Sequence, residues 1–147
     1  MADRIRKVLK EAGLEFLPAD YDETGIHCEL TLIPEALLNL VEKLKIHGFF
    51  LESVSAVDHI DKDIIEGRYL FNHYEEAARL QLKIPTPRMA PVLPSIGAVF
   101  EGAVWHERET AEFFGITFEG AGDTRHLLLP DDADFHPLRK DFSLQQA

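Results

Sequence analysis

Acidic residues and histidines gather at two places in the sequence, and these side chains are the ones best suited to chemistry. The first group lies near the end of the chain and comprises Asp123, Arg125, His126, Asp131, Asp132, Asp134 and His136. Aspartates and histidines are common ligands of catalytic metals. A metal-dependent hydrolase built on this group would use His126, Asp131, Asp132 and His136. The same residues flank Pro130, where acidic side chains are equally typical of a solvated turn.

The second group lies in a segment that is expected to be helical. His106, Glu109 and Glu112 are spaced by three residues, so a helix places them on one face, where they could bind a metal or act as an acid–base pair. Three ligands on a single helix converge poorly, and the ExxH pairs of di-iron bundles are absent. Arg108 stands between Glu107 and Glu109, which favours a desolvated ion pair at an interface.

A third run, near the end of the chain, combines charge with apolar anchors. Arg139 and Lys140 are adjacent cations between Leu138 and Phe142 in a chain whose formal net charge is −11. The plain interpretation is a basic C-terminal stub. The functional interpretation is that the two apolar side chains enter pockets of a partner while Arg139 pairs with a partner carboxylate.

Other chemistries find little support in the sequence. Cys28 is the single cysteine, so an internal disulfide, an iron–sulfur cluster or a CxxC-type zinc site is excluded. The negative charge repels phosphate backbones and anionic lipid, which argues against nucleic-acid binding and direct membrane attachment. The opening residues do not resemble a signal peptide, and residues 89–105 are too short and too interrupted by proline to cross a bilayer. Contact with a membrane is therefore expected only through partner subunits.

Periodicity predicts the elements that position these residues. Helices are expected over 4–12 and from Pro34 to about Gly48, and strands over 27–33, 49–60, 68–74 and 79–84, the last two forming a hairpin. A chain of 147 residues is long enough for one core. We predict an α+β fold: a two-layer domain with a mostly antiparallel sheet of about four strands and two helices, followed by a helical segment and an extended C-terminal tail.

The chain changes character after Pro85. A proline-rich linker leads to a helix that Ser95 can cap and Gly115 can end, with a break at Gly102. We therefore divide the chain into an α+β domain over 1–88 and a helical segment with a partner-wrapping tail over 89–147. The C-terminal tail, residues 116–147, has no sustained period but keeps large apolar residues, namely Phe118, Leu127, Leu128, Leu129, Phe135, Leu138 and Phe142. We expect it to bury them on another polypeptide.

Several runs in this part of the chain match a known family signature. They are Pro91–Ile96, Gly102–Trp105, Glu107–Ile116 with Phe118 and Gly120, Asp123 and Arg125 before Leu127–Leu129, and Pro137–Phe142. Together they resemble the C subunit of NADH dehydrogenase, the small hydrophilic subunit of respiratory complex I and of its energy-converting hydrogenase relatives. Ala121 and Phe135 depart from the residues common in that family. The chain's end soon after Phe142 favours the hydrogenase-like or archaeal-type branch.

The resemblance implies an assembly subunit whose tail wraps on a hydrogenase-like large catalytic subunit, beside an iron–sulfur subunit. It implies no catalytic residues, metal or cofactor on this chain, iron–sulfur clusters on neighbouring subunits, and a peripheral position on the cytoplasmic side of the membrane. The complex would pass electrons from NADH, ferredoxin or another carrier to quinone or protons. The residues predicted to contact partners are Glu107, Arg108, Glu109, Glu112, Arg125, His136, Pro137, Leu138, Arg139, Lys140, Asp141 and Phe142. The alternatives are the stand-alone hydrolase described above and a free-standing regulatory domain.

Overall fold

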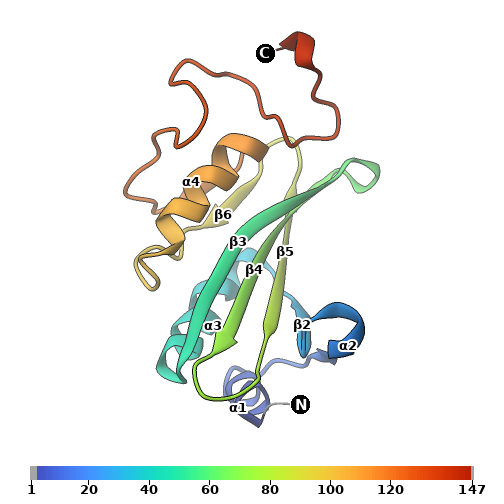
Figure 1. Ribbon diagram of the computed structural model, residues 1–147, viewed down its shortest axis with the longest axis vertical. Coiled ribbons are helices and arrows are strands. Elements are labelled where there is room, and N and C mark those ends of the chain that lie inside the picture. Colours follow the sequence, from blue (N-terminus) through green and yellow to red (C-terminus); the bar gives the residue numbers. More distant parts are fainter. Residues whose placement is uncertain (1–2, 147) are drawn as a thin grey trace.

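The computed structural model describes residues 3–146, so the last residue of the expected tail lies outside it. The helices are α1 (Asp3–Glu11), α2 (Tyr21–Thr24), α3 (Pro34–Ile46) and α4 (Ala103–Phe114), with 3₁₀ turns at Ile60–Lys62 and Leu144–Gln146. The strands are β1 (Leu17–Pro18), β2 (Cys28–Thr31), β3 (Phe49–His59), β4 (Ile64–His73), β5 (Leu80–Pro87), β6 (Val92–Pro94) and β7 (Thr117–Glu119). Figure 1 shows the N-terminus and the C-terminus at opposite ends of the molecule.

The main sheet has five strands in the order β1-β2-β5-β4-β3. Only the β2–β5 pair is parallel, and β4 and β5 form the expected antiparallel hairpin with Tyr69 opposite Leu82. The predicted α+β class with a mostly antiparallel sheet of about four strands is confirmed, and β1 adds a short fifth strand. Strands β6 and β7, which pair in parallel, were not predicted, because three-residue strands are too short to show a period.

The sheet has one apolar face and one charged face. Burial alternates strictly along strand β4: Ile65, Tyr69 and Phe71 are fully buried, whereas the even-numbered positions point the other way. Helices α1, α3 and α4 cover the apolar face and share one core with it (Figure 1). The opposite face carries ion pairs, among them Arg79–Glu52, Lys83–Glu29 and, within β4, Arg68–Glu66. Helices α1, α3 and α4 all cover the same face of the sheet, so the fold has two layers.

Helix α3 follows the predicted pattern. Pro34 stands at its first turn, where a missing N–H costs little, and the side chains of Leu37, Leu40, Val41 and Leu44 are completely buried. Gly48 follows with a φ of 82°, a left-handed conformation that suits glycine. This helix contributes the largest apolar stripe to the core.

Helix α4 is shorter than the sequence suggested. The expected helix from Ser95 is instead a single turn, in which the backbone N–H groups of Val99 and Phe100 bind the carbonyl of Ile96. The Ser95 hydroxyl accepts from the Gly97 N–H at 3.2 Å, so it caps this turn and not α4. Gly102 separates the turn from α4, where a break had been expected. The division of the chain at residue 88 stays a prediction.

Candidate functional site: the C-terminal tail

The described part of the C-terminal tail, residues 116–146, begins inside the fold and then runs over its surface. Ile116 and Phe118 are buried beside β6, where β7 pairs with that strand. Beyond residue 119 the tail has no helix longer than a single 3₁₀ turn and no strand. It crosses the end of the molecule around α4 (Figure 1). Without a ladder of its own, its backbone depends on contacts with the rest of the chain.

Glu112 of α4 makes the first of these contacts. Its carboxylate accepts hydrogen bonds from three successive backbone N–H groups, those of Leu127 (2.9 Å), Leu128 (2.8 Å) and Leu129 (3.3 Å). The side chain is buried within the chain itself. A carboxylate that accepts several N–H groups is strongly held, since these are charge-assisted hydrogen bonds. Glu112 therefore shapes the three-leucine segment.

Arg108, one turn earlier on α4, holds the residues just before that segment. Its guanidinium donates to the carbonyls of Arg125 and His126, at 2.9 Å each, and lies 3.4 Å from Asp123. The side-chain hydrogen bonds of Arg125 keep the pKa of Asp123 well below its usual range. Arg108 thus pairs with Asp123 of the tail, while the carboxylate of Glu107 turns inward to Ser95 and Ile96. That Arg108 lies at an interface with a partner stays a prediction.

The run around residue 138 caps the C-terminal end of α4. The last carbonyls of a helix have no partner within the helix. Three donors of the tail satisfy them: His136 Nδ1 to Glu112 O (2.9 Å), Leu138 N to Phe113 O (3.0 Å) and Arg139 Nε to Phe114 O (2.7 Å). Gly115 permits this close approach, because it has a φ of 74° and a Cβ there would lie 2.7 Å from the His136 ring.

An ion network anchors the tail beyond that cap. Arg88 binds both carboxylate oxygens of Asp58, at 2.7 and 2.9 Å, and Asp141 at 2.7 Å. The backbone N–H of Lys140 donates to Asp58 at 2.8 Å. The Arg88 hydrogen bond lowers the pKa of Asp58 and also that of Asp141, while the two carboxylates raise the pKa of Arg88. The network fastens the tail to the β3–β4 hairpin.

Asp58 and Arg88 were missed by the sequence analysis. Asp58 follows Val54 and Ala56 at the alternate positions of β3 that face the core. A charged residue in that series has no place in an apolar layer unless it is paired, since a buried charge without a partner is costly. That break in the alternation is the signal that could have revealed it.

Glu107, in the first half of α4, binds the turn that precedes the helix and not the tail. Its carboxylate accepts from the Ser95 hydroxyl at 2.6 Å and from the Ile96 N–H at 2.7 Å. The side chain is almost completely buried, and burial raises its pKa. Glu107 thus fixes the turn that precedes α4.

Phe118 departs from the expectation for the tail, because it is buried in this chain's own core. The apolar side chains farther along the tail behave in the opposite way. Leu128 is 64% exposed, Leu138 is 54% exposed and Leu144 is 87% exposed. Phe135 and Phe142 stack on each other, with ring centroids 5.8 Å apart, and both are only half-buried. The tail therefore turns its polar groups inward and leaves leucines at the surface.

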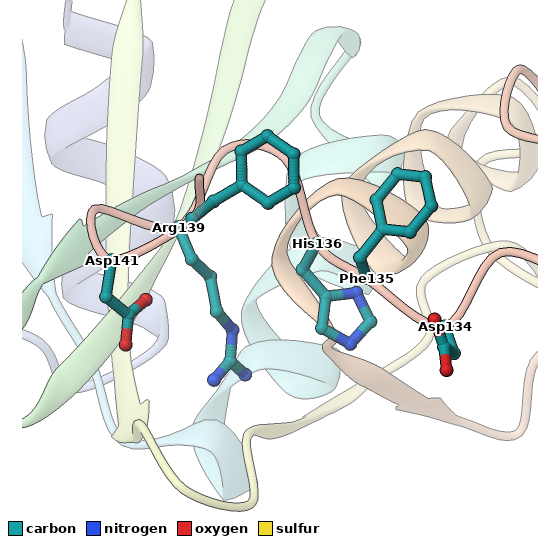
Figure 2. A pocket seen from close by; sticks show the side chains of 6 residues that line it. Asp134, Phe135, His136, Arg139 and Asp141 are labelled. Carbon is teal, nitrogen blue, oxygen red and sulfur yellow. The ribbon is translucent and has the colours of Figure 1, made fainter. Parts of the chain in front are cut away.

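An open depression of about 450 Å³ lies within the tail. It is lined by Asp134, Phe135, His136, Arg139, Asp141 and Phe142. Figure 2 shows the His136 ring and the Arg139 guanidinium extending to the same side of the tail, with Asp134 and Asp141 at the two ends. The depression joins apolar rings to a cation, a mixture suited to protein recognition.

The two candidate metal clusters are not assembled in the part of the chain that the structure describes. Within residues 3–146, no three histidine, cysteine or acidic side chains lie close enough together to hold a metal ion. His126 and His136 each direct Nδ1 at a backbone carbonyl, of Pro130 and Glu112 respectively. Cys28 is buried, and burial raises its pKa to about 12, so its thiol is unreactive.

The predicted partner-contact residues fall into two groups. Glu107 and Glu112 are buried and accept hydrogen bonds within the chain. Side chains of the other group lie at least partly at the surface: Arg108, Glu109, Arg125, His136, Pro137, Leu138, Arg139, Lys140, Asp141 and Phe142. Within this second group, the side chains that also bond to the chain itself are those of Arg108, Arg125, His136, Arg139 and Asp141. Over residues 3–146, no helix combines the length and apolar character needed to cross a membrane.

Solved structures share the fold of this chain. A chain of the membrane-bound sulfane sulfur reductase, an archaeal respiratory membrane complex, superposes with a TM-score of 0.84 at 22% identity, covering 97% of this chain and 85% of that one. A trypsin-resistant fragment of Nqo5 gives a TM-score of 0.68 at 24% identity, covering 82% of this chain and 98% of that one. At these identities the likeness concerns the fold.

Sequence relatives are more informative about the family. The chain is 35% identical to the C subunit of the NADH-quinone oxidoreductase of Mycobacterium ulcerans and 30% identical to the subunit of the same name from Mycobacterium tuberculosis. Each alignment covers 98% of this chain and 64% of the relative, so the chain spans less than two thirds of their length. The family described as "Respiratory-chain NADH dehydrogenase, 30 Kd subunit" matches residues 30–147. The chain belongs to this family of respiratory NADH dehydrogenase 30 kDa subunits.

Proposed function

We propose that this chain is a structural subunit, without a redox centre of its own, of a membrane-associated respiratory oxidoreductase. The complex is an NADH:quinone oxidoreductase or a related energy-converting hydrogenase. Family membership supports the class of complex. The presence of a single, buried cysteine supports the non-redox part, because iron–sulfur clusters need several thiolates.

The observation that carries the proposal is the orientation of the C-terminal tail. Its polar groups are bound to α4 and to the β3–β4 hairpin, while Leu128, Leu138 and Leu144 remain exposed. Exposed leucines on a segment that hydrogen bonds hold in place offer apolar surface that another protein can cover. The tail is thus preorganised, so docking orders few side chains and loses little conformational entropy.

The partner that we propose is the hydrogenase-like large catalytic subunit of the complex, with an iron–sulfur subunit beside it. Electrons pass through iron–sulfur clusters on these neighbours. The chain reaches the membrane only through partner subunits, on the cytoplasmic side. Its net charge of −11 is consistent with an indirect attachment, since anionic lipid repels it.

Replacement of the tail anchors tests this proposal. The Leu138→Ala/Arg139→Ala double variant, tagged and expressed with the other subunits, is expected to recover at least tenfold less of the large subunit than the unaltered chain does. Ile46→Ala, at an exposed apolar position at the end of α3, is the control and should leave recovery unchanged. Circular dichroism of the isolated variants checks that the fold is intact. Full recovery of the complex with the double variant would refute docking through the tail.

Elemental analysis addresses the hydrolase alternative. The purified chain is expected to carry no stoichiometric metal, because its two tail histidines are directed at backbone carbonyls. A bound metal that His136→Ala removes would instead favour the hydrolase.

A further inference from the structure

Arginines in this acidic chain are nearly always paired with a carboxylate. Within residues 3–146, the arginines that form ion pairs are Arg4, Arg68, Arg79, Arg88, Arg108 and Arg125. Arg6 and Arg139 have no carboxylate partner in the described part of the chain. Arg6 is fully exposed on α1, where water solvates it, but Arg139 is half-buried. Asp58 is near enough for the charge of Arg139 to help lower its pKa, but it makes no direct ion pair with Arg139. A direct ion pair would offset the desolvation of this half-buried cation better.

Helix capping explains only part of the Arg139 side chain. Its Nε atom donates to the Phe114 carbonyl at 2.7 Å, and a cation is favourable at a helix C-terminus. The two Nη atoms lie at the far end of the guanidinium and have no protein acceptor among the hydrogen bonds of the described residues. They form the edge through which arginine binds a carboxylate with two parallel hydrogen bonds.

The surroundings leave room beside that edge. Gly115 has no side chain, and a Cβ there would lie 3.0 Å from Arg139 Nη2. The guanidinium lines the 450 Å³ depression together with the half-buried Phe135 and Phe142, whose rings stack on each other. An ion pair gains strength where apolar groups exclude water.

We infer that Arg139 receives an aspartate or glutamate side chain from the subunit on which the tail docks. This inference rests on the proposed function and identifies one element of the partner surface. The incoming carboxylate binds the Nη edge of Arg139, and apolar partner side chains cover Leu138 and the two rings. This ion pair would supply a carboxylate partner to Arg139, the one half-buried arginine that forms no ion pair within the described part of the chain.

The same depression disfavours a phosphate or a lipid headgroup. Asp134 and Asp141 also line it, and a doubly charged phosphate would meet both. Arg88 is shared between Asp141 and Asp58, so each added negative charge meets some repulsion, and a single carboxylate is repelled less than a doubly charged phosphate. The net charge of −11 further repels an anionic membrane surface. A carboxylate on a protein partner therefore fits better than a phosphate.

Zero-length cross-linking in the assembled complex tests the inference. Arg139→Lys places a primary amine in the depression. A carbodiimide then joins this amine directly, without a spacer, to any carboxylate that is in contact with the amine. The expected product, found by mass spectrometry, links position 139 to an aspartate or glutamate of another subunit. Arg6→Lys, at the exposed unpaired arginine, is the matched control and should give no link between subunits.

The possible outcomes separate this inference from the proposed function. If the R139K variant assembles but position 139 links only to Asp134 or Asp141, or to nothing, the inference is overturned while docking of the tail stands. If unaltered chain fails to co-purify with other subunits, the proposed function itself fails. A second variant covers the case in which lysine at position 139 no longer caps α4. Arg139→Gln should weaken association of the chain with its partner subunit roughly 10- to 100-fold and make that association less dependent on salt. Unchanged affinity and salt dependence in R139Q would also contradict the inference.

Discussion

The main sheet and the C-terminal tail distribute polar and apolar groups in opposite ways. Strands β3 to β5 bury their apolar side chains under α1, α3 and α4 and expose charged residues on the other face. The tail attaches itself through backbone and charged groups and exposes leucines. The first arrangement stabilises a chain by itself. The second fixes the shape of a segment and leaves its apolar surface for another protein.

Carboxylates illustrate the same contrast. On the open sheet face Glu52 pairs with the side chain of Arg79, where the strands already satisfy the backbone. In the tail, no strand or helix pairs the backbone N–H groups of Leu127 and Lys140. These groups donate instead to the carboxylates of Glu112 on α4 and Asp58 on β3. Buried carboxylates therefore satisfy backbone N–H groups of the tail that a strand or helix would otherwise satisfy. The difference can be tested by removing one contact at a time from each region.

Core leucines and tail leucines should differ most. Leu40→Ala, in the fully buried stripe of α3, is expected to lower the free energy of unfolding by about 2–5 kcal/mol. Leu138→Ala, at a half-exposed position, is expected to change it by less than about 0.5 kcal/mol. Urea unfolding of the isolated chain measures both. A Leu138→Ala cost similar to that of Leu40→Ala would mean that the tail belongs to the core.

The ion network at Asp58 should rank second. Asp58→Ala removes two hydrogen bonds from Arg88 and one from the Lys140 N–H, and is expected to cost about 2 kcal/mol and to release the end of the tail. Glu52→Ala, on the open sheet face, is the control and should cost about 1 kcal/mol or less. Hydrogen exchange at residues 139–142 reports the release. Unchanged exchange in D58A would show that the network does not hold the tail.

Two glycines with the same backbone conformation sharpen the role of the helix cap. Gly115→Ala and Gly120→Ala each place alanine at a left-handed φ, of 74° and 82°, which costs about 1 kcal/mol. Only at Gly115 would the new Cβ collide with His136, at 2.7 Å, whereas Gly120 has open space around it. Faster exchange of the Leu138 N–H is therefore expected in G115A alone. Equal exchange in both variants would argue against the cap.

Acid should loosen the tail before the sheet, as the smallest of these effects. Asp58 and Asp141 have lowered pKa values in the folded chain, through Arg88. Their contribution to stability is complete above the unfolded value of about 3.9 and is lost as the pH falls through the lower folded values. Glu107 has the opposite sign, because burial raises its pKa. Tail exchange is expected to rise below about pH 4 in the unaltered chain and to be less sensitive to acid in Asp58→Asn. An identical acid response in both would contradict this assignment.

Periodicity was sufficient to predict the main layers of the fold. The apolar stripe of α3, the alternation of β5 and the short connection before Leu80 predicted a helix, a strand and a hairpin that the structure contains. It could not predict β6 and β7, whose three-residue segments show no period and pair with each other across the whole length of α4 in the sequence. Nor could periodicity predict where α4 begins. Ser95 and Ile96 form a separate turn and donate hydrogen bonds to the carboxylate of Glu107, which lies more than ten residues farther along the chain.

The tail was predictable in composition but not in contacts. Its large apolar residues and lack of period indicated an extended segment, and Leu128 and Leu138 are exposed. The inward orientation of Glu112 depends on three N–H groups fifteen or more residues away along the chain, which no local pattern encodes. For the same reason Arg88, outside every motif, was overlooked as the anchor of Asp141.

Thiol labelling at one tail position tests most directly the claim that the exposed leucines are reserved for a partner. Cys28 is buried with a pKa raised to about 12, so Leu138→Cys introduces the one readily reactive thiol of this chain. In the isolated chain a maleimide should modify it at nearly the rate of an exposed Ile46→Cys control. In the assembled complex the rate at position 138 should fall at least tenfold while the control is unchanged. Equal labelling of L138C in the free and assembled states would contradict the account.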